Sequence, residues 1–327
     1  MERGVSLKSI KLTVEYTNDI TRWIKLINLV AQAGFEYIQI SVILSKLDGK
    51  IKYQVLEKLI EHEKSISKDK YMVFSNAIII SHNTRIGYHL LKYLSKNSFE
   101  VIYRIDTLEH RKLKQISCNR SKLFKKNVRC KIHTDCEYSA NNYTILKKQG
   151  IALNKEIPLY QNSEAMTSEF KKWLYDKHGV AVSHFNNAVA SFLLGNNGNN
   201  CTHNSCLGRT LYLNKDGIIC FCPIKPQKTE LRNISEVESF EEIFNSNSFA
   251  LCVDAALKKR ETCMVSCQGF KFCQGGCPLL TGNECNNREY MNFMQGVETI
   301  LKGLDYSDLS VYNPSFKEIY LTSISSL

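Results

Sequence analysis

Four cysteines lie within fifteen residues, in the stretch CMVSCQGFKFCQGGC from Cys263 to Cys277, and this stretch constrains the fold more than any other. Ten of the thirteen cysteines follow residue 200. No signal-peptide pattern opens the chain, and no apolar run approaches the roughly 20 residues that span a bilayer. We therefore expect a cytoplasmic protein without a membrane partner. Thiols stay reduced in that compartment, so clustered cysteines indicate metal rather than disulfides.

The net charge of +11 raises the question of a nucleic-acid partner. The densest basic stretch, residues 110–131, lacks the interleaved aromatic side chains that stack on bases. It is predicted to be a solvated helix and loop, and no nucleic-acid partner is expected.

A polar run of glycine and asparagine, LLGNNGNN at residues 193–200, predicts a linker and divides the chain into domains 1–193 and 194–327. Before it, period-two and helical patterns alternate, which is typical of a parallel α/β sheet, either a partial barrel or doubly wound. Asp19 is the predicted N-cap of the first helix. Strands are predicted at 9–16, 36–44, 70–80, 99–106, 127–135 and 180–184, and helices at 19–34, 52–66, 84–96, 143–150 and 164–179.

The second domain is predicted to have little core, so a metal would be needed to hold it together. A hairpin with a two-residue Asp216-Gly217 turn is expected first. Helices are expected over 235–259, with Ser235 as cap, and over 289–303. Cys252, on the first of these helices, is expected to be a buried small hydrophobe.

The spacing of the cysteines favours iron–sulfur clusters over structural zinc. Zinc pairs usually have a two-residue gap or use histidine, whereas no pair here has that gap and His203 is the sole histidine after residue 200. Eight thiols would fill two four-cysteine sites. The candidate ligands are Cys201, Cys206, Cys222, Cys263, Cys267, Cys273, Cys277 and Cys285.

This spacing, together with GRTLYLNKDGIICFCP and SFEEIFNSNSF, resembles the SPASM domain, the C-terminal iron–sulfur extension of radical S-adenosylmethionine (SAM) maturases. The resemblance implies two [4Fe–4S] clusters. One would use Cys201, Cys206, Cys222 and Cys277, and the other Cys263, Cys267, Cys273 and Cys285. Cys263-x3-Cys267 has one residue more than is usual in that family, which a loop should tolerate. Cys220 is an alternative to Cys222 and is expected to share its strand face.

The first domain resembles the radical SAM barrel without its catalytic motif. The resemblance implies a partial (β/α)6 barrel, but the chain has no C-x3-C-x2-C motif, and Tyr16 stands where the first cysteine is expected. SAM binding and cleavage are therefore not expected. The first-half cysteines, Cys118, Cys130 and Cys136, lie far from the first strand. On a strand His133 would point away from Cys130 and Cys136, so these three are not expected to bind a metal.

The resemblance implies a role in the maturation of a ribosomally synthesised peptide or protein. The chain would relay electrons, bind the substrate, or both, as the partner of a radical SAM enzyme or a peptide ligase, and would itself have no catalytic residue. Two alternatives remain open. One is a stand-alone redox enzyme that uses Cys220 and Cys222 as exchangeable ligands. The other is a non-catalytic binding protein with structural clusters. Met1 and the strand that soon follows favour a chain with no missing N-terminal piece.

Overall fold

The structure of the protein is a computed structural model. It describes residues 9–17, 19–44, 53–69, 72–81, 88–105, 112–113, 116, 130–134, 142–149, 152–154, 162–194, 207–222, 226–267, 270 and 288–325. The chain forms two compact units, here called unit 1 (residues 1–102, 119–129 and 206–254) and unit 2 (residues 103–118, 130–205 and 255–327). The predicted boundary between residues 193 and 194 stays a prediction, and the linker residues 195–200 lie outside the described residues.

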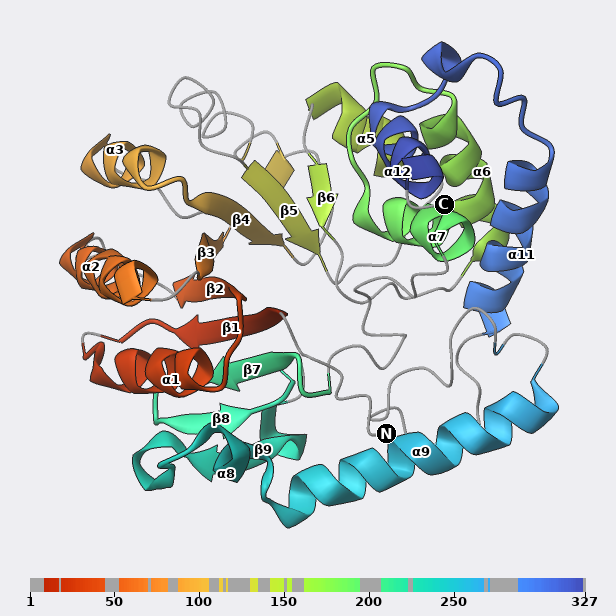
Figure 1. Cartoon of the computed structure of the whole chain (residues 1–327). Coiled ribbons are helices and arrows are strands. Elements are labelled where there is room, and N and C mark those ends of the chain that lie inside the picture. The colour runs from red at the N-terminus through yellow and green to blue at the C-terminus, as the bar shows by residue number, and fades with distance from the viewer. Residues whose placement is uncertain are drawn as a thin grey trace. The chain divides into compact units, whose positions relative to one another are not determined.

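Unit 1 begins with strands and helices in strict alternation (Figure 1). The elements are β1 Ser9–Glu15, α1 Thr21–Gln32, β2 Tyr37–Leu44, α2 Tyr53–Asp69, β3 Val73–Ser81, α3 Tyr88–Lys96 and β4 Glu100–Ile105, which runs into unit 2. β1 pairs with β2, and β2 with β3, all in parallel. The predicted α/β fold is confirmed. Each apolar strand is followed by a helix that brings the chain back to the end of the sheet where the next parallel strand begins.

Helix α1 forms where apolar residues recur at helical spacing. Trp23, Ile27 and Val30 are among its buried residues, and the chain leaves the helix through Gly34, whose φ of +82° favours glycine. The predicted N-cap was wrong by one residue. Ile20 is the N-cap and its side chain makes no cap hydrogen bond, whereas Asp19 Oδ1 accepts a bond of 2.9 Å from the Thr21 amide.

Three short strands from the second half of the chain extend this sheet in the order β3-β2-β1-β7-β8-β9. They are β7 Thr210–Leu213, β8 Ile218–Cys220 and β9 Glu230–Asn233. β7 pairs in parallel with β1, while β8 and β9 add antiparallel pairs. A hairpin that the sequence assigns to the second domain therefore continues the sheet of the first.

The segment after β9 is more broken than the predicted helix over 235–259. It contains η3 Ile234–Glu236, α8 Phe240–Phe244 and α9 Asn247–Ser266, which runs into unit 2, while η2 Pro226–Lys228 precedes β9. Ser239, not Ser235, caps α8, and its Oγ accepts a hydrogen bond of 3.4 Å from the Glu242 amide. Ser235 instead lies in η3, which Asn233 caps.

Unit 2 pairs two parallel strands and packs a cluster of helices around buried aromatic rings. Phe170, Trp173, Phe185 and Phe293 pack with ring centroids 5.5–6.2 Å apart. The elements are β5 Cys130–Thr134, α5 Asn142–Gln149, β6 Ala152–Asn154, α6 Ser163–Leu174, α7 Ser183–Leu193, α11 Arg288–Lys302, η4 Leu309–Val311 and α12 Pro314–Ser325.

Two predictions for this unit have opposite outcomes. The amphipathic helix predicted over 289–303 is confirmed as α11. The strand predicted over 180–184 is wrong, because Ser183 and His184 already belong to α7, which buries His184 and Phe185. Burial of Phe185 among the helices outweighs the β-propensity of the preceding valines.

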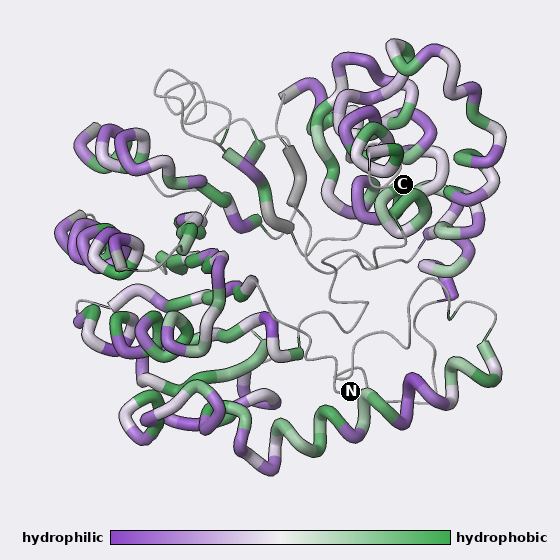
Figure 2. The backbone as a smooth tube through the Cα atoms, in the orientation of Figure 1, coloured by the Kyte–Doolittle hydropathy of each residue, from purple (hydrophilic) through white to green (hydrophobic). Residues whose placement is uncertain are grey.

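Along α9, hydrophobic and hydrophilic stretches alternate (Figure 2). Ala256 is its one buried residue, and Leu251 and Val265 are 69% and 86% exposed. Of the basic stretch 110–131, residues 112, 113, 116, 130 and 131 are described, and residues 112, 113 and 116 are helical. No helix in the described part of the chain is long and apolar enough to cross a membrane.

Candidate metal centre

Three of the eight predicted ligands lie in the described part of the chain. Cys222 follows β8 in unit 1, and Cys263 and Cys267 lie at the end of α9 in unit 2. Cys201, Cys206, Cys273, Cys277 and Cys285 lie outside the described residues. Within the described residues, no three His, Cys, Asp or Glu side chains form a group that could hold a metal. Convergence of the eight thiols therefore stays a prediction.

The hairpin that carries Cys220 and Cys222 turns at residues 214–217. Asn214 Oδ1 accepts hydrogen bonds from the amides of Asp216 and Ile218, at 3.0 and 2.8 Å. Gly217 closes the turn with a φ of +90°. The turn is thus longer than the predicted two residues, but the glycine stands where a positive φ requires it.

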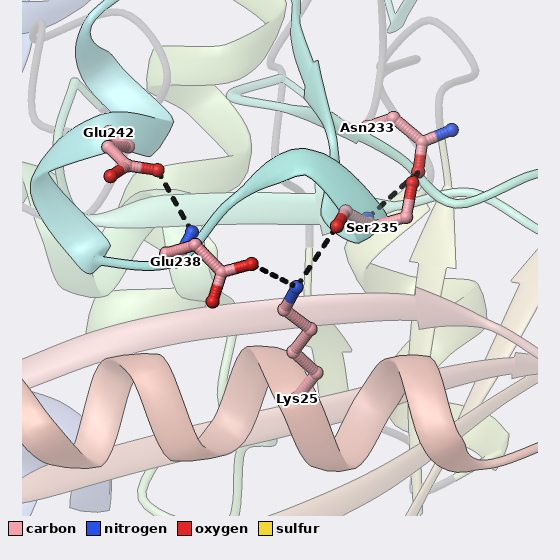
Figure 3. Close-up of polar contacts among 5 residues, drawn as sticks. All are labelled: Lys25, Asn233, Ser235, Glu238 and Glu242. Carbon is pink, nitrogen blue, oxygen red and sulfur yellow. Dashed lines mark hydrogen bonds and ion pairs between the residues drawn. The ribbon is translucent and has the colours of Figure 1, made fainter.

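Two basic side chains of α1 contact the turn between β7 and β8 and the segment that follows β9. Arg22 Nη1 donates to the Lys215 carbonyl at 2.8 Å, and Lys25 Nζ donates to the Ser235 carbonyl at 3.2 Å (Figure 3). Glu238 Oε1 lies 3.7 Å from the same ammonium, but the Glu238 side chain is 82% exposed, so this ion pair adds little. The hairpin is therefore anchored on the first helix of the chain.

The segment that Lys25 contacts is ordered by its own polar side chains. Asn233 Oδ1 accepts from the amide and the hydroxyl of Ser235, and Glu242 Oε2 accepts from the Glu238 amide at 2.9 Å (Figure 3). These local bonds present the Ser235 carbonyl to α1.

A polar row crosses one face of the unit 1 sheet. Thr13 on β1 is paired with Ser41 on β2 and with Tyr212 on β7, and Tyr212 is paired with Cys220 on β8. Paired residues point to the same side of a sheet, so these four side chains share a face. The opposite face carries Asn76 on β3, whose Nδ2 donates to Glu63 Oε2 of α2 at 2.8 Å.

Glu15 ties the end of β1 to the hairpin. Its carboxylate accepts a hydrogen bond from the Tyr212 hydroxyl and one of 3.0 Å from the Lys215 amide. Hydrogen bonds to a carboxylate are stronger than neutral ones, so this contact fixes the hairpin against β1.

Cys220 and Cys222 occupy different environments. Cys220 ends β8, is 1% exposed, and has its pKa raised to about 12 by burial and by the nearby Glu230, Cys222 and Glu15. Cys222 lies beyond the strand, after a bend at Phe221 and an irregular register at Ile219 and Cys220. The two cysteines thus do not share one strand face, contrary to prediction.

Cys263 and Cys267 are brought together by helical spacing. The Cys267 amide donates to the Cys263 carbonyl at 2.9 Å, so the extra residue between them lies in a helix rather than in the predicted loop. Helical residues four apart have Cβ atoms about 5–6 Å apart on one face. Both are half-buried, and Cys267 is a free thiol. This spacing fits two ligands of one metal site.

The remaining cysteines are placed as follows. Cys252 lies on α9 but is only half-buried, so the prediction of a buried hydrophobe was wrong; the helix around it buries little. Cys130 and His133 lie on β5, whereas Cys118 and Cys136 lie outside the described residues.

Sequence reasoning missed the residues that hold the hairpin. The alternation of Lys11, Thr13 and Glu15 with buried neighbours on β1 could have indicated a polar face ending in Glu15. No comparable pattern marks Tyr212.

The fold of parallel strands and covering helices is similar to that of solved structures of an AdoMet-binding protein. Hexahistidine-tagged anSMEcpe with bound AdoMet superimposes with a TM-score of 0.71 over 96% of this chain and 98% of the other, at 16% identity. Native anSMEcpe with bound AdoMet and Kp18Cys peptide gives 0.69 over 90% and 98%, also at 16% identity. At this identity the likeness shows the fold alone, which is the predicted radical-SAM-like α/β fold.

A curated protein gives a second match, at the level of sequence. A cysteine-type anaerobic sulfatase-maturating enzyme from Clostridium novyi (strain NT) is 27% identical over 158 residues, which make up 48% of this chain. The match spans 37% of that relative's length. No protein-family model matches the chain. The sequence match therefore covers about a third of the relative, and the structural matches concern the fold.

Proposed function

We propose that this chain is an iron–sulfur protein of the radical SAM/SPASM type that acts in the maturation of a ribosomally synthesised peptide or protein. The observation that carries the proposal is the eight-cysteine spacing in a chain with the fold of anSMEcpe, which has a solved structure with bound AdoMet and a peptide. The match to a sulfatase-maturating enzyme supports the same role. Residues 194–327 are proposed as the SPASM domain and residues 1–193 as the barrel.

Two [4Fe–4S] clusters are the proposed cofactors. Cys201, Cys206, Cys222 and Cys277 would hold one, and Cys263, Cys267, Cys273 and Cys285 the other. Cys263 lies in the last turn of α9 and Cys267 directly follows the helix, and these two half-buried thiols fit such a site. A fully ligated cluster supplies one-electron transfer when bound. The chain's own contribution is to hold the thiolates and, through the hairpin contacts of Glu15 and Tyr212, to fix the segment that carries Cys222.

We propose that the chain does not cleave SAM, although its structural neighbours bind AdoMet. No C-x3-C-x2-C motif is present, and the five-residue connection from β1 to α1 contains no cysteine. Tyr16, which stands where the first cysteine is expected, packs edge-on against Trp23 with ring centroids 6.4 Å apart. That position is thus occupied by an aromatic contact instead of a ligand.

An accessory role follows from these two properties. Clusters without an open iron position suit electron relay, and the fold suits peptide binding, so the chain would act beside a radical SAM enzyme or a peptide ligase. A stand-alone redox enzyme with exchangeable Cys220 and Cys222 remains the second candidate. The position of Cys220 within β8, where it is 1% exposed, weakens it.

Anaerobic purification followed by iron and sulfide analysis tests the cofactors. Two clusters of four irons predict about eight of each per chain. Two zinc ions per chain, or a colourless product without iron, would contradict the proposal.

The second measurement adds SAM and a reductant to the iron-loaded protein. We expect no 5′-deoxyadenosine and an unchanged electron paramagnetic resonance spectrum. Formation of 5′-deoxyadenosine would show that the barrel is catalytic. Turnover of a peptide by the isolated chain would favour the stand-alone enzyme.

A further inference from the structure

Thr229 contacts the backbone of Cys222. Its side chain has none of its surface exposed, and its Oγ1 lies 3.3 Å from the Cys222 amide nitrogen. The same oxygen lies 3.3 Å from the Cys222 carbonyl and 3.2 Å from the Pro226 carbonyl. A hydroxyl has one hydrogen to donate, so Thr229 accepts from the Cys222 amide and donates to one of the two carbonyls.

Backbone bonds close the same loop from both ends. The Phe221 amide donates to the Thr229 carbonyl at 3.2 Å, and the Thr229 amide donates to the Pro226 carbonyl at 2.9 Å. Phe221 has no exposed surface, and Cys222 has 9%. Because Thr229 is shielded from solvent, water cannot readily take over the bonds of its hydroxyl, and removing it would leave the Cys222 amide without this partner.

We propose that Thr229 is a positioning residue that sets the backbone of Cys222, so that Cys222 rather than Cys220 presents its thiol to the metal. The inference rests on the proposed function only in taking Cys222 to be a cluster ligand. Two cysteines two residues apart compete for one position, and the hydroxyl of Thr229 contacts the backbone of Cys222. The hydrogen bonds of Thr229 therefore fix the backbone from which the Cys222 thiol projects.

Thr229→Val removes the hydroxyl at nearly constant volume, and Thr229→Ser restores it without the methyl group. Thr210→Val, on β7 of the same hairpin, is the matched control for the loss of a threonine hydroxyl. Iodoacetamide labelling of the reduced, metal-free proteins under native conditions, read by peptide mass spectrometry, measures how well each Cys222 is held. Cys263 in the same sample is the reference thiol.

We expect Cys222 of Thr229→Val to react about fivefold faster relative to Cys263, as loss of one net hydrogen bond implies. Thr229→Ser and Thr210→Val should react as the wild type does. In the iron-loaded proteins, Thr229→Val should change the electron paramagnetic resonance spectrum of the reduced cluster, and Thr229→Ser should restore it. A purely structural role would lower stability without changing that spectrum.

Wild-type labelling rates and spectra in Thr229→Val would overturn the inference, and so would a Thr229→Ser protein that behaves like Thr229→Val. If Thr229→Val does not fold by circular dichroism, Thr229→Ala replaces it with the same expected results. A wild-type protein without iron would refute the proposed function alone, because the labelling of the metal-free proteins still decides whether Thr229 holds Cys222.

Discussion

The two described parts of the candidate metal centre, the hairpin before Cys222 and the end of α9, differ in how well the surrounding protein packs against them. The hairpin before Cys222 is part of a sheet, has Ile219 and Phe221 fully buried, and is tied to β1 by Glu15 and to α1 by Arg22. Cys263 and Cys267, in contrast, lie at the end of a helix with a single buried residue, beside Val265, which is 86% exposed.

This difference indicates which part depends on metal. The hairpin has its own hydrogen bonds and apolar contacts, so we expect it to fold without a cluster. The end of α9 buries too little apolar surface to offset the entropy of ordering, so its order would come from the metal.

Metal removal should give the largest effect and tests this comparison directly. After anaerobic chelation, backbone amides around Cys263 and Cys267 should exchange with deuterium about a hundredfold faster, while those of β7 and β8 stay protected. Cys267→Ser should reproduce this pattern without chelation. Cys252→Ser, on the same helix but not a predicted ligand, is the control. Equal loss of protection in both regions would mean that the hairpin also depends on metal.

The stability of the sheet that carries the hairpin should fall as the pH rises through about 7. Burial raises the pKa of Glu63 to about 7, although the hydrogen bond from Asn76 partly opposes this. The folded state then binds more protons than the unfolded state, so stability is fully present below the ordinary pKa and is lost as the pH passes the folded one. The loss should be about 3 kcal/mol between pH 4.5 and 8.

Urea unfolding of Glu63→Gln against the wild type measures this loss. The Glu63→Gln variant should lose this pH dependence of stability. Glu57→Gln, at an exposed position on the same helix, should keep it. Burial lowers the pKa of His62, which gives a slope of opposite sign, but that contribution cancels when variant and wild type are compared. A wild-type stability that rises between pH 6 and 8 in step with the variant would refute the assignment.

Loss of the Glu15 carboxylate should loosen the hairpin by an intermediate amount. Glu15→Ala removes the acceptor for Tyr212 and for the Lys215 amide, and should lower the free energy of unfolding by about 2 kcal/mol. Hydrogen exchange should rise in β7 and β8 but not at the end of α9. Tyr212→Phe, which removes one of the two bonds, should have roughly half the effect.

The smallest effect is expected for Lys25. Lys25→Met removes the bond to the Ser235 carbonyl and the ion pair with the exposed Glu238, which together should contribute less than about 1 kcal/mol. Thermal unfolding at low and high salt checks this. A larger loss would mean that α1 holds the hairpin mainly through this lysine.

Local patterns predicted most of the first sheet. The apolar, β-branched runs of β1 and β2 and the helical apolar face of α1 are properties of consecutive residues, which a sequence displays directly. Short elements such as β6 and β9 were missed because three or four residues carry too little pattern. The strand expected at 180–184 failed because packing of Phe185 outweighed the local preference.

The metal chemistry of the candidate site stays a prediction from the sequence, whereas the contacts that support the hairpin were missed. Cysteine spacing indicates a metal, and the structure adds that the Cys267 amide bonds to the Cys263 carbonyl at the end of α9. The partners that hold the hairpin are distant in sequence: Tyr212 contacts Glu15 across 197 residues. Such pairs depend on the parallel register of β1 with β7, which no local pattern reveals.

The pairing of β7 with β1 makes the two halves of the polypeptide inseparable. Because β1 has neighbours on both sides, a fragment cut at the linker would bare the main chain from Lys11 to Val14. Unpaired strand edges pair with other chains, so such a fragment would tend to aggregate rather than remain a monomeric domain. A chimaera that takes its cysteine-bearing half from a related gene would also aggregate, unless the new hairpin could pair with β1.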